Sequence, residues 1–235
     1  RLLQLHGTKF QFGGTPTLGC QHGLFTLKTL LNAHKNHHLP SFVAFVDLVK
    51  AYDTANHELL IKILEKYGAP PKFVAAIKKM YTNLTVVLKI DKEIRHICQR
   101  VGVRQGDNMA PVLFLFLMSA AAETLEIERN NHNIDFLTVA HAPDDDITTG
   151  KIRGHTPRMY NSCHLTTYKI FQLLYVDDSA FIFPTREALI KGLSLLHNHL
   201  ARFGLEVHIG RNGDPSKTEC NFFPPPQFFN NVTNT

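Results

Sequence analysis

The sequence predicts an α+β fold in which helices back an antiparallel sheet, and three observations support this. The chain has 235 residues, of which 44% are hydrophobic, enough to bury the core of one or two domains. Segments with apolar residues at helical spacing are interspersed with short apolar runs that are typical of strands. Two pairs of these runs are separated only by short turns, as in β-hairpins.

The first part of the chain predicts a helix, a strand and two more helices. Leucines recur every three or four residues within Leu18–His38, which indicates an amphipathic helix. The run Phe42–Val46 is typical of a buried strand, and Asp47 follows at its end. The next helix begins after the N-cap residue Asn56 and closes at Gly68. Another helix is predicted over Pro71–Tyr81.

The middle of the chain predicts a hairpin, a loop and a long apolar helix. The hairpin pairs Thr85–Ile90 with Ile94–Cys98. A glycine-flanked loop, Gly102–Gly106, then leads into a helix over Ala110–Glu126. The stretch 129–167 is rich in Asn, His, Asp, Thr and Gly and has little periodicity, so we expect an insertion of loops and short strands there.

The last part predicts a second hairpin, a helix and a final strand. The apolar runs Phe171–Val176 and Ala180–Phe183 form the hairpin, with two exposed acids at its tip. Residues 187–203 have a helical pattern, and 205–209 alternate as in a half-buried strand. The element order therefore reads β-α-α-β-β-α-β-β-α-β. A Pro- and Asn-rich tail, 224–235, is expected to be disordered.

Charge, cysteine content and hydropathy exclude several classes of protein. Lys and Arg number 25 against 20 Asp and Glu, giving a formal net charge of +5 that is not gathered into one basic tract. The four cysteines include no CxxC pair, which argues against a disulfide framework or a zinc site. The longest apolar run is too short for a membrane span. We expect an intracellular protein of the nucleus or cytoplasm without a membrane partner, and a fragment of a longer chain, because residue 1 is Arg and no signal peptide follows.

Three carboxylates at strand ends are the sharpest candidate for chemistry. Asp47 ends one predicted strand, and Asp177 and Asp178 lie at the tip of the second hairpin. If the fold brings them together, they repel one another unless a divalent cation offsets their charge. Oxygen ligands without Cys or His favour Mg²⁺, and two such ions support in-line phosphoryl transfer. The alternative is that these acids are ordinary turn residues.

These acids lie inside four motifs that resemble those of reverse transcriptases, in the family's order. Tyr175–Asp178 resembles motif C, Phe45–Asp53 motif A, Gly102–Gly106 with Pro111 motif B, and Gly204–Leu205 followed by Ser216–Glu219 motif D. The wording of motifs A and B is most similar to the non-LTR retrotransposon branch. The resemblance implies a polymerase palm with a partial fingers region over residues 1–223.

The resemblance also implies roles for the palm acids and their neighbours. Asp47 and Asp177 would be the principal metal ligands, with Asp178 completing the charge of the site. The main-chain carbonyl of Leu48 would add another oxygen ligand. Tyr52 falls where the family has a ring under the sugar of the incoming nucleotide, which would block a 2′-hydroxyl; the alternative is a core aromatic residue.

Motifs B and D supply the remaining residues. Gln105 would contact the nascent base pair, while Arg104 and Gly106 complete the nucleotide-binding loop, in which glycine lets the main chain approach a ligand closely. Lys217 would be a catalytic cation that protonates the leaving pyrophosphate.

The implied function is RNA-templated DNA synthesis by two-metal nucleotidyl transfer, with an RNA template, a DNA primer and dNTPs. Two Mg²⁺ ions would be the cofactors, with Mn²⁺ as a substitute. The finger motifs and thumb expected on either side of this chain would lie elsewhere in a polyprotein, so the fragment alone can be inactive. The alternatives are a non-catalytic nucleic-acid-binding remnant of a decayed element and, within polymerases, an RNA-dependent RNA polymerase, against which Tyr52 argues.

Overall fold

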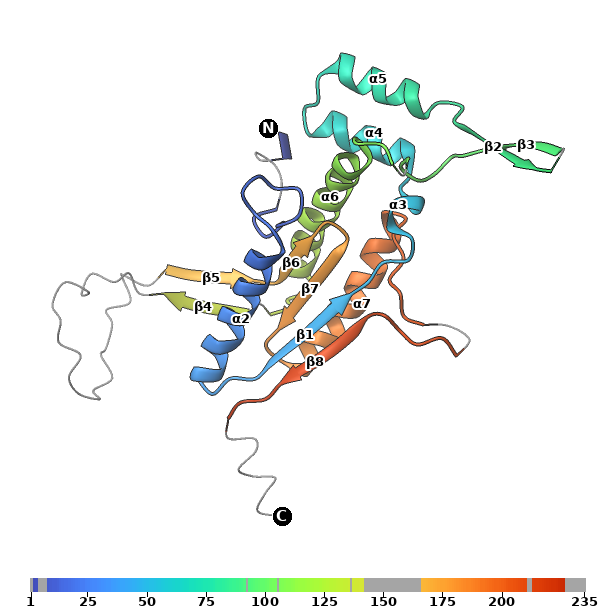
Figure 1. Ribbon diagram of the computed structural model, residues 1–235. Helices are drawn as coiled ribbons and strands as arrows, with labels where there is room; N and C mark the ends of the chain where they lie inside the picture. Colours follow the sequence, from blue (N-terminus) through green and yellow to red (C-terminus); the bar gives the residue numbers. More distant parts are fainter. Residues whose placement is uncertain are drawn as a thin grey trace.

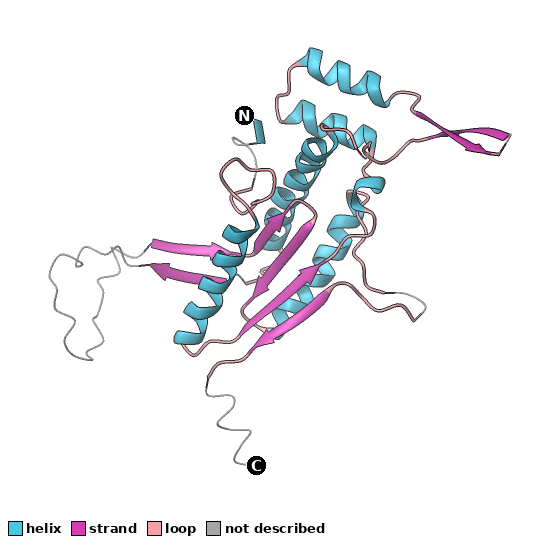
Figure 2. Cartoon of the chain, in the orientation of Figure 1, coloured by secondary structure: helices cyan, strands magenta, loops and turns pink. Residues whose placement is uncertain are grey.

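The fold was examined in a computed structural model of the chain. It describes residues 2–3, 8–91, 93–104, 106–135, 137–141, 166–210 and 213–226. Helices and strands share one body, from which two hairpins project (Figures 1 and 2).

A four-stranded antiparallel sheet lies at the centre, in the order β6-β7-β1-β8. Its strands are β6 (Gln172–Tyr175), β7 (Asp178–Phe183), β1 (Ser41–Val46) and β8 (Glu219–Phe223). Strand β1 is central and has helices on both of its faces, so Val43 and Ala44, which point to opposite faces, are both fully buried. Burial on both faces explains why β1 reads as a continuous apolar run.

One face of the sheet packs against helices α6 (Ala110–Asn131) and α7 (Arg186–Arg202) (Figure 1). Helix α6 is long and apolar enough to cross a membrane, but most of its apolar stretch is buried against the rest of the protein. Thr185 begins α7 as its N-cap, accepting a hydrogen bond from the amide of Ala188. The core between these helices and the sheet includes Phe114, Leu117 and Phe183.

The other face of the sheet is covered by helix α2 (Cys20–Asn36). Leu27 and Leu30 of this helix pack with Val43 and Ile182 of the sheet in a second apolar core. Side chains alternate along a strand, so Phe45 and Asp47 point to the same face as Val43. The carboxylate of Asp47 therefore lies on the face of the sheet that α2 covers.

A helical lobe extends from the end of β1. It contains α3 (Ala51–Thr54), α4 (His57–Lys66), α5 (Pro71–Tyr81) and the hairpin of β2 (Thr85–Ile90) and β3 (Glu93–Cys98). Every residue of these two strands is exposed, and the hairpin projects from the body (Figure 2). A second hairpin pairs β4 (Leu137–His141) with β5 (Thr166–Ile170).

Most predicted elements are confirmed. Helix α5 and strand β2 have the predicted bounds, and Asn56 caps α4 by accepting a hydrogen bond from the amide of Leu59. Helix α6 continues five residues beyond the predicted end, to Asn131, at the start of the predicted insertion. Of that insertion, residues 142–165 lie outside the described residues, as do 227–235 of the predicted tail.

The predicted strand over 205–209 is wrong. Val207 makes only an isolated bridge to Leu48, and Leu205 is buried beside the helices instead. The fourth strand is β8, where Phe222 pairs with Phe42 and stacks on its ring, the centroids 4.8 Å apart. An edge strand with all residues exposed lacks the alternating pattern by which a half-buried strand is identified in sequence.

Candidate active site

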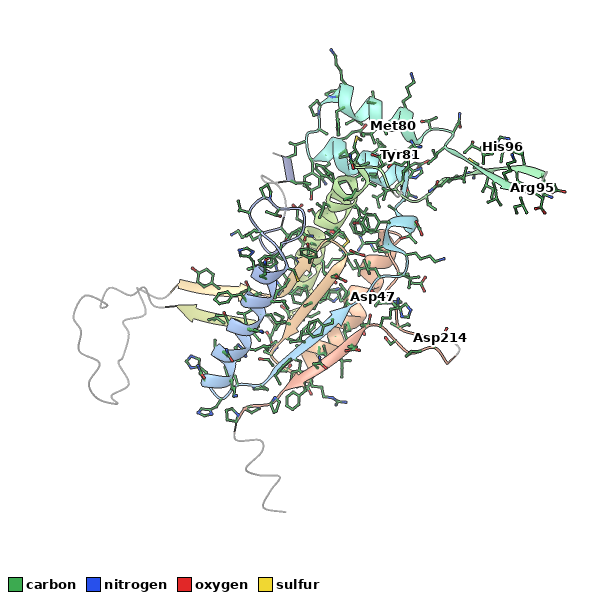
Figure 3. The ribbon with its side chains drawn as sticks, viewed as in Figure 1. Asp47, Met80, Tyr81, Arg95, His96 and Asp214 are labelled. Atoms are coloured by element: carbon green, nitrogen blue, oxygen red, sulfur yellow. The ribbon has the colours of Figure 1, made fainter. Side chains whose placement is uncertain are left out.

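The sheet register brings the three predicted acids to one edge. Val46 of β1 pairs with Ser179 of β7. Asp47, the residue after Val46, therefore lies beside Asp178, the residue before Ser179. Asp177 precedes Asp178 in the turn that joins β6 to β7. Figure 3 shows Asp47 at the end of β1. Ser179, which sequence reasoning missed, is buried and donates a hydrogen bond from Oγ to the carbonyl of Val46 (3.3 Å), which ties the two strands at this point.

The three carboxylates influence one another electrostatically. The pKa of Asp178 is raised above its ordinary value, first by partial burial and then by the negative charges of Asp177 and Asp47. Within the described part of the chain, no three His, Cys, Asp or Glu side chains are arranged as a metal-binding group. The three acids therefore share one sheet edge without forming a preformed metal-binding group.

A cavity of about 360 Å³ opens in front of two of these acids. Apolar residues of α2 and the sheet line one side of it, including Leu24, Leu27 and Phe45. Asp47, Asp178 and the predicted cation Lys217 also line it. The lining is mainly apolar, and the two acids and the lysine are its charged members.

Hydrogen bonds hold the segment that carries Lys217 against the end of β1. The amide of His208 donates to the carbonyl of Asp47 (2.9 Å), and the amide of Asp47 donates to Oγ1 of Thr218 (3.3 Å). The amide of Lys217 in turn donates to Nδ1 of His208 (3.3 Å). Sequence reasoning missed His208 and placed Thr218 in motif D without a role, because the pattern shows neither the loop geometry nor the contact with β1.

Leu48 and Tyr52 continue the chain beyond Asp47. In the bridge between Leu48 and Val207, the amide of Val49 donates to the carbonyl of Glu206. The amide of His208 donates to the carbonyl of Asp47. The carbonyl of Leu48 therefore points to the opposite side, toward β7. The half-buried ring of Tyr52 stacks on Phe114 (centroids 4.5 Å apart), and burial, followed by the charge of Asp177, raises the pKa of its hydroxyl.

The predicted motif B loop lies against Tyr52. The amide of Val103 donates to the carbonyl of Tyr52 (2.7 Å), and the amide of Gly102 donates to that of Ala55 (2.7 Å). Gly102 has a φ of 90°, and a Cβ there would lie 2.8 Å from the carbonyl oxygen of Asp53. Glycine at 102 is thus required by packing within the protein.

The structure describes two of the other three predicted residues of this loop. Arg104 and Gly106 are exposed, and Gly106 has a φ of 84° with open space where a Cβ would stand. Gln105 lies outside the described residues. Neither Arg104 nor Gly106 lines the cavity in front of the acids, so the acids with Lys217 form one group and Tyr52 with this loop a neighbouring one.

The segment 10–13 was also missed by sequence reasoning. It runs parallel to β6, with a bridge between Gln11 and Leu174, and reaches the turn that carries the acids. Only the pair Gly13–Gly14 hinted at a close approach of main chains, and nothing in the pattern named the partner.

Comparison with known proteins agrees with this geometry. The family model "Reverse transcriptase (RNA-dependent DNA polymerase)" matches residues 3–210. The Pol polyprotein of the type-2 retrotransposable element R2DM of Drosophila melanogaster is 30% identical over 138 residues, which are 58% of this chain and 13% of that protein. The Pol polyprotein of an R2 element of Nasonia vitripennis is 28% identical over 167 residues, 71% of this chain and 13% of its own length.

The fold is shared with telomerase. The structure of telomerase from Candida tropicalis in complex with a fragment of telomeric RNA has a TM-score of 0.63 at 14% identity, covering 94% of this chain and 32% of that one. The apo form from the same organism, truncated from its C-terminal domain, has a TM-score of 0.56 at 14% identity, covering 87% of this chain and 35% of that one. These matches confirm the predicted palm-like α+β fold, and the chain belongs to the reverse transcriptase family, of the non-LTR retrotransposon type.

Proposed function

We propose that this chain is the palm of an enzyme that synthesises DNA on an RNA template by nucleotidyl transfer. The observation that carries the proposal is the placement of Asp47, Asp177 and Asp178 at one sheet edge, beside a cavity that Lys217 also lines. Membership of the reverse transcriptase family supports the same reaction. The chain spans only 13% of the first two curated relatives, so the remaining parts of such an enzyme, the fingers and thumb, would come from other regions of a polyprotein.

The donor set suits hard divalent cations. Three carboxylates and the carbonyl of Leu48 offer oxygen atoms, which Mg²⁺ prefers, and Mn²⁺ can replace it. The pKa of Asp178 is raised first by burial and then by the negative charges of Asp177 and Asp47, and a bound cation would offset that repulsion. Since the described side chains form no preformed metal-binding group, binding would require Asp47, Asp177 and Asp178 to turn toward one another.

In the proposed reaction the primer 3′-oxygen forms a bond to the α-phosphorus of a dNTP, and the bond from that phosphorus to the departing pyrophosphate breaks. The chemistry that two bound divalent cations supply is activation of the 3′-hydroxyl and stabilisation of the leaving group. The ammonium group of Lys217, which lines the same cavity, would donate a proton to the pyrophosphate oxygen. Tyr52, beside Asp177, would exclude a ribose 2′-hydroxyl from the incoming nucleotide.

The template and primer are proposed from the relatives. The Candida tropicalis telomerase of similar fold is bound to RNA, which supports a nucleic-acid partner for this fold. The Pol polyproteins that match in sequence come from retrotransposable elements, which supports an RNA template copied into DNA.

Titration with Mn²⁺ followed by water-proton relaxation tests the cation site. We expect binding by the unaltered chain and a loss of at least about tenfold in affinity for Asp47→Asn/Asp177→Asn, since two ligand charges are removed. Asp91→Asn, at the tip of the distant β2–β3 hairpin, is the matched control and should bind as the parent does. Unchanged affinity in the double variant would show that these acids hold no cation. Binding of nucleic acid without any cation site would favour the non-catalytic remnant.

A further inference from the structure

The turn that carries two of the acids contains a residue in an unfavourable conformation. Val176, directly before Asp177, has a φ of 61°. This left-handed region is disfavoured for residues other than glycine and most of all for β-branched ones. Such a conformation persists only where the surroundings hold it, and it is often found at functional sites.

One buried side chain holds this residue from the neighbouring segment. Gln11 is 6% exposed, and its Oε1 accepts hydrogen bonds from the amides of Val176 (3.0 Å) and Gly13 (3.0 Å). The amide of Phe12 donates to the carbonyl of Leu174 (2.8 Å), so the main chains are already paired up to that point. The Gln11 carboxamide adds one more hydrogen bond to this pairing, at Val176, the first residue after β6.

The fit of this segment against the turn is close. A Cβ on Gly13 would lie 2.6 Å from Cγ2 of Val176 and 2.7 Å from its amide nitrogen, so only glycine permits the approach. The Nε2 of Gln11 is buried and finds no partner among the residues that the structure describes. Among the described residues the carboxamide is bonded through its oxygen alone, which points to a role for that oxygen.

We propose that Gln11 is a positioning residue that holds Val176 in its left-handed conformation and thereby sets the direction of Asp177 and Asp178. It forms no hydrogen bond to either carboxylate and acts through the main chain of the turn. The role in cation binding rests on the function proposed above, whereas the hold on Val176 does not depend on it.

The first test substitutes Gln11→Met, which keeps the approximate volume and removes the carboxamide oxygen. We expect the Val176 amide to exchange with solvent about tenfold faster, as measured by NMR, since its hydrogen bond is removed. Mn²⁺ affinity should fall by a similar factor. The matched control is Thr15→Val, which removes a hydrogen bond from Thr15 Oγ1 to the carbonyl of Gln11 (2.8 Å) and should leave both readouts unchanged.

The second test separates positioning from a general structural role. Glycine adopts a positive φ without strain, so Val176→Gly should make the turn independent of Gln11. In the Val176→Gly background, Gln11→Met should change Mn²⁺ affinity by less than about twofold, against about tenfold with Val176 in place. An equal loss in both backgrounds, or no loss in either, would overturn the proposal.

The remaining outcomes are also decisive. If Gln11→Met fails to fold while Gln11→Met/Val176→Gly folds, the proposal is supported; if neither folds, it is overturned. If the unaltered chain binds no Mn²⁺, the proposed function fails, and exchange of the Val176 amide still decides whether Gln11 holds the turn.

Discussion

At the scale of single residues, Tyr52 joins the two groups of the candidate site. Its ring stacks on Phe114 of α6 and lies near Asp177, while its carbonyl accepts the amide of Val103 from the motif B loop. A ring fixed by stacking on one face cannot easily move away from a ligand on its other side. In the proposed function, Tyr52 would select between sugars by the bulk of this ring.

Replacing this ring tests sugar selection. In a full-length protein with the proposed activity, Tyr52→Val should lower the preference for dNTPs over rNTPs by about tenfold or more, because space opens for a 2′-hydroxyl. Incorporation of each nucleotide in primer extension on an RNA template gives the ratio. Tyr52→Phe keeps the ring and should retain the preference. If Tyr52→Val leaves the ratio unchanged, the residue is only part of the core.

At the scale of elements, a polar contact joins the two helices behind the sheet. His199 of α7 is buried, with Nε2 2.9 Å from the carbonyl of Ala121 and Nδ1 2.9 Å from Oε2 of Glu128 in α6. Glu128 also accepts from Arg202 of α7. Partial burial acts to raise the pKa of Glu128, but the hydrogen bonds from His199 and Arg202 outweigh it and lower the pKa.

This contact predicts acid sensitivity of the helix pair. A carboxyl whose pKa is lowered by folding stabilises the native state above its ordinary value of 4.5, and the contribution disappears as the pH falls through the lowered pKa. Chemical denaturation at pH 6 and near pH 3 should therefore show a smaller decline in the free energy of unfolding for Glu128→Gln than for the parent. Glu187→Gln, in the first turn of α7, is the control and should decline as the parent does. Equal declines in the parent and Glu128→Gln would contradict this.

The elements also show what sequence can and cannot reveal. Asn56, the β2–β3 hairpin and the strand ending at Asp47 were predictable because each depends on local spacing or on a cap. The acids and Lys217 were predictable as a group only through the order of four motifs. Strand β8 and the hold of Gln11 on Val176 depend on contacts between distant segments, which leave no periodic trace in the sequence.

At the scale of the whole molecule, positive charge is concentrated in the lobe beyond β1. From the start of α3 to Arg104, residues 51–104 contain ten Lys and Arg and five Asp and Glu, a net charge of 10 − 5 = +5, which equals that of the whole chain. The remaining residues therefore sum to no net charge. Figure 3 shows the hairpin of this lobe, with Arg95 and His96, well away from Asp47.

This asymmetry predicts where nucleic acid binds. Affinity for an RNA–DNA duplex should fall as salt rises, and replacing the exposed Lys72, Lys78 and Lys79 with Gln should reduce the slope of log affinity against log salt by about one for each phosphate that is no longer neutralised. Lys191→Gln, on the exposed side of α7, is the control. Fluorescence anisotropy over a salt series gives both slopes. A greater effect of Lys191→Gln would place the binding surface elsewhere.

The ends of this lobe meet at one point of the fold. Asn56 bridges to Val101, the carbonyl of Ala55 accepts the amide of Gly102, and the His57 ring contacts the carbonyl of Gly102 (2.7 Å). The segment between these residues therefore leaves the body of the protein and returns to it at the same place. Its outer part, the β2–β3 hairpin above all, can therefore change in length or sequence without moving the sheet edge that holds the acids.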